Sequence, residues 1–246
     1  MSKEDFVFGT RAVTEAINAG KPIEKILFKK GLNNELFHEL YQKIKDAEIP
    51  FQFVPIEKIN RVTRKNHQGV IALLSPVDFQ EIENVLPLIY DSGNDPLLLI
   101  LDQISDVRNF GAIVRSAECG GVHAVIIPEK GSARINADAA KTSAGALFNV
   151  PICRTENLKK TIEFLKESGV KIVAASEKAE KLYTESDMNV PLAIITGSEE
   201  NGISGSILEI SDELIKIPIL GKIESLNVSV ASSLIIYEAV RQRSKA

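Results

Sequence analysis

Polar residues suited to chemistry gather in three segments of the sequence, each following a hydrophobic run. D-Q-I-S-D-V-R-N-F-G-A-I-V-R-S-A follows residues 97–101, G-S-E-E-N-G-I-S follows 192–196, and L-G-K-I-E-S-L-N follows 215–219. The side chains that could act on a substrate are Asn109, Arg115, Glu199, Ser225 and Asn227. Amide, guanidinium, carboxylate and hydroxyl groups orient substrates, hold phosphate and place hydrogen bonds. They therefore suit a reaction in which a cofactor carries the reactive atom.

Several other chemistries lack the residues that they need. No strand-like run is followed by G-x-G-x-x-G, which argues against a nicotinamide-dependent enzyme. Gly197 and Gly202 are spaced as in a P-loop, but the Lys-Ser/Thr pair that should follow is missing. The sequence has no G-x-S-x-G, and His38, His67 and His123 lie outside the three segments. A Ser–His hydrolase and a zinc site both lack parts, so we expect no metal.

Each candidate side chain also has a purely structural interpretation. Asn109 could cap the helix that it begins, and Ser225 and Asn227 could cap the last helix, because Ser and Asn are favoured N-caps. Arg115 could be solvated on a helix face, and Glu199 could be a surface acid or a partner for Arg115. No single residue decides between structure and function, so the prediction of a site depends on the three segments meeting.

Alternating strand and helix patterns in the second part of the chain predict the framework that would bring these segments together. Strands are expected at 97–101, 123–127, 171–175, 192–196 and 215–219, and helices at 109–119, 137–147, 157–166 and 227–243. This alternation is typical of a mostly parallel sheet covered by helices on both faces. Ligands bind beyond the carboxyl ends of such strands, so all three segments should converge on one pocket.

The first part of the chain is predicted to be a separate α/β module. Residues 1–75 contain a helix from about Thr10 to Gly20, an amphipathic helix at 34–47, and strands at 23–28, 51–54 and 69–74. The stretch 75–96 has three prolines and the turn cluster D-S-G-N-D-P, which indicates a linker with a short helix. We therefore expect a first domain at 1–75, a linker at 76–94 and a second domain at 95–246.

Composition indicates a soluble cytoplasmic protein. The chain has 246 residues, of which 44% are hydrophobic and 25% charged, and its longest apolar run, 97–101, is too short to span a bilayer. Acidic residues stand near the N-terminus where a signal peptide would be apolar. Cys119 and Cys153 show no C-x-x-C spacing, which fits a reducing compartment.

Charge is unevenly distributed along the chain. Residues 1–75 carry 12 Lys and Arg against 9 Asp and Glu, whereas the remainder carries 17 against 24. The segment K-I-N-R-V-T-R-K-N-H at 58–67 contains no acid. A local basic cluster matters more than total charge for binding a phosphate backbone, although charge alone fits a solvated loop equally well.

Three ordered motifs resemble the SpoU (TrmH-like) RNA 2′-O-ribose methyltransferases of the SPOUT class. They are N-F-G-A-I-V-R-S-A at 109–117, I-T-G-S-E-E-N-G-I at 195–203, and I-P-I-L-G-K-I-E-S-L-N-V-S-V-A at 217–231. F-G-T-R-A-V-T-E-A at 8–16 and H-Q-G-V-I-A at 67–72 look like the substrate-binding module of that family. The resemblance covers the whole chain and is strongest to the bacterial enzymes that methylate a guanosine ribose in 23S ribosomal RNA.

The resemblance implies a C-terminal domain with a trefoil knot that binds S-adenosylmethionine and forms a homodimer. Its cofactor pocket maps onto Thr196, Gly197, Ile217 and Leu226. Its catalytic set maps onto Asn109, Arg115, Glu199, Ser225 and Asn227. Glu200 adds a second acid to the middle motif, and the motif alignment favours Glu199 as the functional one.

Roles for these residues follow from the same resemblance. The family proposal makes the motif-one Arg a base, but a guanidinium with a pKa above about 12 is hard to deprotonate. We therefore expect Arg115 to anchor phosphate and stabilise an oxyanion, with Glu199 holding Arg115. Asn109 and Ser225 would orient the ribose, and Asn227 would brace the cofactor loop. The basic residues expected to contact RNA are Lys58, Arg61, Arg64, Lys65 and His67, with Arg11 a weaker candidate.

Two other functions remain open. A transfer-RNA ribose methyltransferase of the same family would run the same chemistry, but members with a short N-terminus lack the 75-residue module. A non-catalytic RNA-binding protein with this fold would have less reason to keep polar residues in all three motifs.

Overall fold

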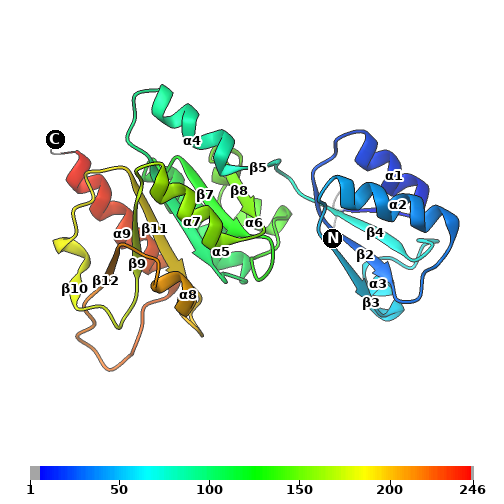
Figure 1. Ribbon diagram of the computed structural model, residues 1–246. Coiled ribbons are helices and arrows are strands. Elements are labelled where there is room, and N and C mark those ends of the chain that lie inside the picture. Colours follow the sequence, from blue (N-terminus) through cyan, green and yellow to red (C-terminus); the bar gives the residue numbers. More distant parts are fainter. Residues whose placement is uncertain (1–5, 245–246) are drawn as a thin grey trace. The chain divides into compact units, whose positions relative to one another are not determined.

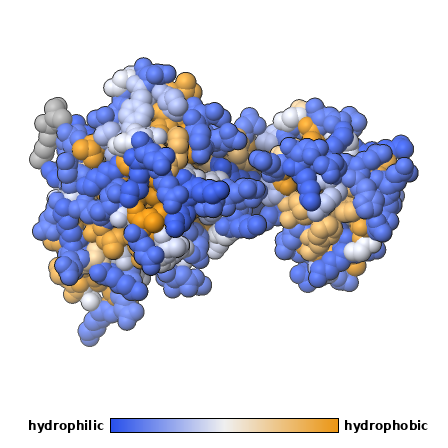
Figure 2. Space-filling model, in the orientation of Figure 1, coloured by the Kyte–Doolittle hydropathy of each residue, from blue (hydrophilic) through white to orange (hydrophobic). Residues whose placement is uncertain are grey.

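The computed structural model describes residues 6–244, which divide into two compact units (Figure 1). Hydrophilic residues cover most of the face seen in Figure 2. The first unit takes in the chain up to Asp78 together with Ile135–Ala137, and the second takes in Phe79–Arg134 and the residues from Asp138 on. Within the described part of the chain, no helix has the length and apolar character needed to cross a membrane.

The first unit is a four-stranded mixed sheet with helices on both faces. Its strands are β1 (Phe6–Phe8), β2 (Ile23–Lys29), β3 (Phe51–Val54) and β4 (Val70–Leu74), in the order β1-β4-β2-β3. Alternate residues of β2 and β4 face opposite sides, as the pleat of a strand requires. One side packs against α1 (Thr10–Asn18) and α2 (Glu35–Asp46), and the other against α3 (Ile56–Val62).

The basic segment 58–67 begins on a helix that the sequence pattern did not predict. Ile59 is fully buried under the sheet and fixes α3, while Lys58 and Arg61 on the same helix are exposed. Arg64 and Lys65 follow in the exposed connection to β4. The segment is therefore partly a helix with an anchored apolar side, and only its second half is a solvated loop.

The second unit contains an eight-stranded sheet in which every strand pair is parallel, which confirms the predicted fold class. The strand order is β10-β12-β9-β11-β6-β7-β8-β5. The strands are β5 (Phe79–Gln80), β6 (Leu97–Asp102), β7 (Ala124–Pro128), β8 (Ile152–Thr155), β9 (Lys171–Ala175), β10 (Lys181–Leu182), β11 (Leu192–Gly197) and β12 (Glu213–Lys216). The central strands are continuously apolar because both of their faces are covered.

Helices cover both faces of this sheet. The helices are α4 (Ile82–Asp91), α5 (Val107–Cys119), α6 (Ala137–Thr142), α7 (Leu158–Glu167), α8 (Gly205–Leu208) and α9 (Val228–Arg243). Apolar residues of α4, α7 and α8 share one buried cluster with alternate residues of the strands. Helix α9 lies against α5 and β11 (Figure 1). The stretch 76–94, expected to be a linker with a short helix, contains β5 and α4.

Three predicted boundaries are wrong, each for a local reason. The helix expected at 137–147 ends at Thr142, because Ala144 and Gly145 adopt φ values of 52° and 90° before a 3₁₀ turn at Ala146–Phe148. The strand expected at 215–219 ends at Lys216, two residues before a proline that cannot donate to a ladder. The helix expected to start at 109 starts two residues earlier, because Asp106 serves as its N-cap.

Strand order determines where the three polar loops lie. Strand β11 pairs with both β6 and β9, and β12 pairs with β9 on its other side. Because these four strands are parallel, the loops after β6, β11 and β12 leave the same edge of the sheet. After β12 the chain returns as α9 to pack beside α5 and β11.

Candidate active site

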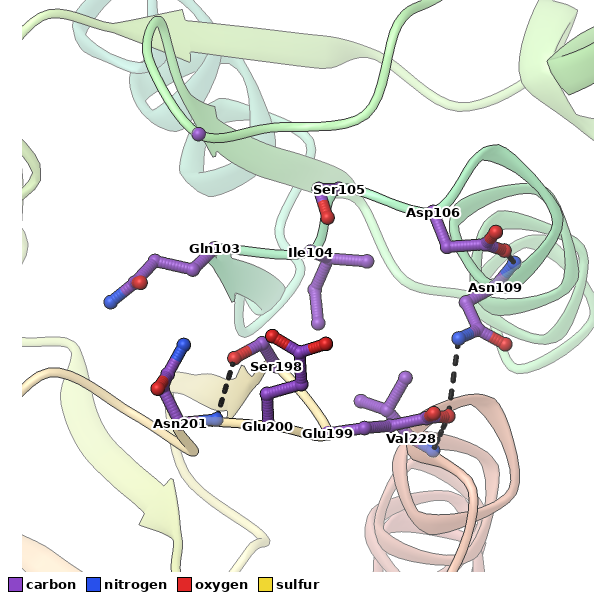
Figure 3. Close-up of a pocket in the computed structure, with 11 residues that line it drawn as sticks. Gln103, Ile104, Ser105, Asp106, Asn109, Ser198, Glu199, Glu200, Asn201 and Val228 are labelled. Carbon is purple, nitrogen blue, oxygen red and sulfur yellow. Dashed lines mark hydrogen bonds between the residues drawn. The ribbon is translucent and has the colours of Figure 1, made fainter.

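Side chains from all three loops form one hydrogen-bonded network at the carboxyl edge of the sheet, of which Figure 3 shows Asn109 and Glu199 beside Val228. Asn109 donates from Nδ2 to Oε1 of Glu199 at 3.1 Å. Asn227 donates from Nδ2 to Oδ1 of Asn109 at 3.0 Å and also to Oε1 of Glu199. The backbone N–H of Val228 approaches the same Glu199 oxygen at 3.3 Å. One carboxylate thus joins the start of α5 to the start of α9.

Asn109 is available for this network because another residue caps its helix. Asp106 is the N-cap of α5, and its Oδ1 accepts hydrogen bonds from the backbone N–H groups of Arg108 and Asn109 at 2.9 and 2.8 Å. The interpretation of Asn109 as a helix cap is therefore wrong. Its side-chain amide, released from capping, extends to Glu199 and Asn227.

Asn227 has both of the roles that the sequence left open. It is the N-cap of α9, and its Oδ1 accepts from the backbone N–H of Ser229 at 3.0 Å. Its Nδ2 faces the other way, toward Asn109 and Glu199. An amide carries an acceptor and a donor group on one side chain, so it can cap a helix and bridge to a neighbouring loop at once.

The turn that presents Glu199 requires glycine at its base. Ser198 and Gly202 form an isolated antiparallel bridge, with N–O distances of 3.1 and 2.9 Å. A Cβ on Gly197 would lie 2.1 Å from the carbonyl carbon of Gly202, which no side chain can do without moving the backbone. The close approach of Gly197 and Gly202 closes residues 198–202 into a tight turn with Glu199 and Glu200 at its tip.

The other two predicted catalytic residues lie outside the network. Arg115 is exposed on α5 and makes no hydrogen bond or ion pair with another residue of the described structure. The expectation that Glu199 holds Arg115 is therefore wrong: the donors to Glu199 are two asparagines and a backbone N–H, all at Oε1. Arg108 lies two helical turns before Arg115, so both cations are on one exposed face of α5. Ser225 is exposed in the loop that leads to Asn227.

Of the residues expected to bind the cofactor, Ile217 and Leu226 lie in the loop between β12 and α9, whereas Thr196 and Gly197 end β11. Thr196 is 2% exposed, and its Oγ1 accepts a hydrogen bond from Ser232 of α9 at 3.2 Å. Leu226 is partly exposed within the loop, and Ile217 is half-buried where the loop begins. Within the described structure, no backbone N–H or C=O of residues 218–226 has a protein partner. Free backbone groups beside the apolar side chains of Leu220 and Ile223 fit a purine nucleoside, whose ring edge needs hydrogen bonds and whose faces are apolar.

A pocket of about 290 Å³ adjoins the network (Figure 3). Its lining combines residues from the loops after β6, β7 and β11 with the first residue of α9. These are Gln103, Ile104, Ser105, Asp106, Asn109, Gly131, Ser198, Glu199, Glu200, Asn201 and Val228. Gln103, Ser105 and Asp106 were not singled out from the sequence. Their position directly after a buried strand was the signal that could have identified them.

The basic residues of the first unit lie around the start of α1 and the end of α3. A separate hollow is lined by Glu57, Asn60, Arg61 and Arg64. His67 is engaged at both ring nitrogens: Nδ1 accepts from the backbone N–H of Gly69 at 2.9 Å, and Nε2 lies 3.0 Å from Oδ1 of Asn60. Its neighbour Gln68 accepts the backbone N–H of Thr10 at 3.1 Å, which joins the two N-terminal motifs beside Arg11. Both ring nitrogens of His67 are therefore engaged within the protein, where they hold Asn60 and Gly69 in place.

Metal chemistry finds no support in the described residues. Among them, no group of three or more His, Cys, Asp or Glu side chains could hold an ion. His123 accepts the backbone N–H of Leu97 at Nδ1, and burial lowers the pKa of its imidazole. Cys153 lies in the core, where burial raises the pKa of its thiol to about 12.

Comparison with known families gives a match to each unit. The SpoU rRNA methylase family model matches residues 96–237, and a model described as RNA 2′-O ribose methyltransferase substrate binding matches residues 6–80. The chain is 37% identical over 241 residues to a Staphylococcus aureus protein assigned to the TrmH family of tRNA/rRNA methyltransferases. That alignment covers 98% of this chain and 97% of the relative. A Bacillus subtilis protein of the same family, YacO, is 32% identical over the same shares of both chains.

Solved structures show the same fold. The Streptomyces viridochromogenes SpoU methyltransferase AviRb, crystallised with AdoMet, superposes with a TM-score of 0.63 and 23% identity, covering 98% of this chain and 91% of that one. The Aquifex enzyme described as A. aeolicus TrmH/SpoU tRNA modifying enzyme superposes with a TM-score of 0.56 and 32% identity, covering 67% of this chain and 85% of that one. Two family models in order along the chain, full-length relatives and a shared fold agree. The chain belongs to the SpoU (TrmH-like) family of RNA methyltransferases.

Proposed function

We propose that this protein transfers a methyl group from S-adenosylmethionine to the 2′-oxygen of a guanosine ribose in 23S ribosomal RNA. The observation that carries the proposal is the network of Asn109, Glu199 and Asn227, in which three loops from distant parts of the sequence meet at one edge of a parallel sheet. Polar groups fixed in this way can hold a ribose in one orientation, and alignment of two reactants lowers a barrier by several kcal/mol.

The loop at 217–226 and the adjoining Thr196 and Gly197 would hold the cofactor. When bound, S-adenosylmethionine supplies an electrophilic methyl group on a sulfonium. The free backbone groups of the loop would fix the adenosine, and Asn227 braces the loop where it enters α9. AviRb was crystallised with AdoMet, and its shared fold supports a similar use of this edge.

The remaining catalytic residues act on the RNA side. Arg115 stands on an exposed helix face and makes no ion pair with a residue of the described structure, so its charge is available to a phosphate or to the oxyanion that develops on the ribose. Arg108 extends the same cationic face. Ser225 would hydrogen-bond the ribose from the loop.

A homodimer and a trefoil knot are parts of the same proposal. A groove of about 310 Å³ runs between α5 and α9, and Val230, Leu234 and Tyr237 expose 47%, 39% and 50% of their surface along it. The small side chains of Ser229 and Ser233 would let a second copy approach closely. The path from β11 to β12 and back through α9 supports the knot. Two free cysteines fit a reducing compartment such as the cytoplasm.

The first unit would bind the RNA backbone through its basic residues. Lys58, Arg61, Arg64 and Lys65 are exposed and free of carboxylate partners in the described structure. Reversing Arg61 and Arg64 to Glu should weaken RNA binding and leave cofactor binding unchanged. The slope of log K for RNA against log salt concentration should become shallower by about 1 or more. Lys21→Glu, at an exposed position away from this cluster, is the matched control. Equal salt slopes for the double variant and wild type would rule out the contact.

Labelled S-adenosylmethionine tests the proposed reaction directly. The protein is incubated with unmodified large-subunit rRNA and, in parallel, with unmodified tRNA, and the product is digested with alkali. Label in an alkali-resistant dinucleotide from rRNA is the expected result, because a methylated 2′-oxygen blocks cleavage. Label only in tRNA would establish the tRNA-modifying alternative, which the similarity to the Aquifex enzyme keeps open. Cofactor binding with no transfer to either RNA would contradict the proposal.

A further inference from the structure

The second acid of the middle motif has no partner, although its neighbour has three. Glu199 accepts hydrogen bonds from Asn109, Asn227 and the backbone of Val228. Glu200 makes no hydrogen bond or ion pair with any other residue of the described structure. The two side chains also diverge: Glu199 extends toward Asn109, whereas Glu200 points toward Ile104 across the pocket (Figure 3). The turn therefore directs one carboxylate into the network and the other into the pocket.

The pocket that receives Glu200 suits a flat, partly polar ring. Ile104 and Val228, 3% and 7% exposed, supply apolar surface, while Ser105 and Asn201 add a hydroxyl and an amide. Enzymes that act on an extruded nucleotide hold its base in this manner, with apolar side chains at the ring faces and hydrogen bonds at its edge. Val228 lines the pocket and also donates its N–H to Glu199. A base in the pocket would thus have its ribose beside the network.

The wall of the pocket opposite Glu200 is held in a strained conformation. Gln103 has a φ of 59°, in the left-handed region that favours glycine, and its Nε2 donates to Oγ of Ser204 at 2.7 Å. The backbone N–H of Ser204 in turn donates to the buried carboxylate of Asp102 at 2.7 Å. These bonds tie the loop after β6 to the end of the 198–204 segment. Strain of this kind persists where surrounding contacts enforce it, and it concentrates at functional sites.

The chemistry of a carboxylate restricts which base it can recognise. An ionised Glu only accepts hydrogen bonds, so its ligand must present N–H donors. Guanine presents two donors side by side, N1–H and N2–H, which match the two oxygens of one carboxylate. Adenine and cytosine place an acceptor nitrogen beside their amine, and uracil places a carbonyl on each side of its single N–H. Both arrangements bring lone pairs against the carboxylate.

We propose that this pocket binds the base of the target nucleotide and that Glu200 selects guanine by accepting hydrogen bonds from N1–H and N2–H. The proposal rests on the proposed function, since it places the base of the methylated nucleotide. Arg108 and Arg115 lie on an exposed face of α5, the helix that carries Asn109, and would attract the phosphate of an incoming nucleotide. Glu200 is thus a specificity-determining residue, and Glu199 belongs to the network that orients the ribose.

Small changes to the base and to Glu200 test this assignment. After the methylated position is mapped, synthetic RNAs carry guanosine or inosine there, the latter lacking the N2 amine. Wild-type kcat/KM should fall about 10-fold or more on inosine, because a bidentate pair is worth about 1–3 kcal/mol of discrimination. Glu200→Gln should lose about 10- to 100-fold in kcat/KM on guanosine, and the variant should turn over inosine nearly as well as guanosine. Glu209→Gln, at an exposed position after α8 and outside the pocket, should match wild type on both RNAs.

Each alternative result has a separate meaning. Calorimetric titration with S-adenosylmethionine should give the same affinity for Glu200→Gln as for wild type, which excludes misfolding as the cause of a loss. A mapped nucleotide other than guanosine overturns the inference. Equal turnover of guanosine and inosine by an active wild type also overturns it and leaves the proposed function standing. Absence of transfer by the wild type to every RNA refutes the proposed function and this inference with it.

Discussion

Replacing Asn227 with Asp separates the two tasks of this side chain. Asp caps helices about as well as Asn, so the hydrogen bond from the backbone N–H of Ser229 should remain. The donor that reaches Oδ1 of Asn109 and Oε1 of Glu199 is lost, because an oxygen takes the place of Nδ2. The variant therefore keeps the helix cap and places a new carboxylate at position 227 facing the carboxylate of Glu199.

The free energy of unfolding that Asn227→Asp loses has three contributions, two lost hydrogen bonds and one repulsion between carboxylates. Each lost hydrogen bond contributes about 1 kcal/mol. Two carboxylates about 4 Å apart repel by about 1 kcal/mol in water and about 4 kcal/mol at an effective dielectric constant of 20. Glu199 and Asn227 are both exposed, so the smaller value applies. The sum is about 2–3 kcal/mol, which for a chain of this size lowers Tm by roughly 4–12 °C.

Thermal unfolding at two salt concentrations distinguishes these contributions. The stability of Asn227→Asp against unfolding should rise by about 1 kcal/mol in 1 M salt, where charges beyond about 3 Å are screened. A similar gain in stability is expected when Glu199→Gln is added to Asn227→Asp, because it removes the opposing charge. Asn227→Ala loses the cap and both bridges but adds no charge, so its deficit should not depend on salt. Methyl transfer should fall in all of these variants, because each one breaks the network.

Two results would refute this reasoning. One is a Tm for Asn227→Asp equal to that of the wild type at low salt. The other is additivity of Asn227→Asp and Glu199→Gln within about 0.5 kcal/mol, since coupled neighbours deviate by more than that. Either result would mean that the bridge between α5 and α9 does not form in solution.

Three further predictions address the framework around the site. Gly197→Ala should destabilise by at least about 1–3 kcal/mol in urea unfolding, because its Cβ would lie 2.1 Å from the backbone, whereas Gly205→Ala, with nothing within 4 Å, should be neutral or better. Burial alone would raise the pKa of Glu213, but hydrogen bonds from two lysines and a serine lower it from 4.5 to about 2. This stabilisation is present above about pH 4.5 and is lost as pH falls toward 2. It amounts to at most about 3 kcal/mol before solvent screening, and urea unfolding of Glu213→Gln between pH 2 and 6 should lack that dependence. Arg243→Lys should cost about 2 kcal/mol in the same assay, because its guanidinium donates to four backbone carbonyls that an ammonium cannot all reach.

Much of the framework could be predicted from the sequence. The apolar runs at 97–101 and 192–196 predicted buried parallel strands, and the loops after parallel strands share an edge by geometry alone. Asn227 could be identified as a helix cap because its residue type and its place before an apolar-periodic stretch are local properties. The order of the three motifs was enough to indicate the family, which the matched models confirm.

Short strands and element ends were harder to predict. Strands β5 and β10 have two residues each, and their pairing with β8 and β12 depends on segments that are distant in sequence. The break after Thr142 requires a left-handed backbone at Ala144, which no residue preference of alanine suggests. Such features depend on packing that the local pattern does not contain.

The partners within the site were decided by tertiary structure alone. The sequence supplied Asn109, Arg115, Glu199 and Asn227 as candidates, and charge made Arg115 the natural partner of Glu199. The fold instead places Arg115 on an exposed helix face and brings Asn109 and Asn227, 90 and 28 residues away in sequence, to the carboxylate. The direction of each side chain depends on the cap at Asp106, the turn closed at Gly197 and the order of the strands. Residue types therefore determined which chemistry was available, whereas long-range packing determined which groups meet, because side-chain direction is set by contacts that no local stretch of sequence contains.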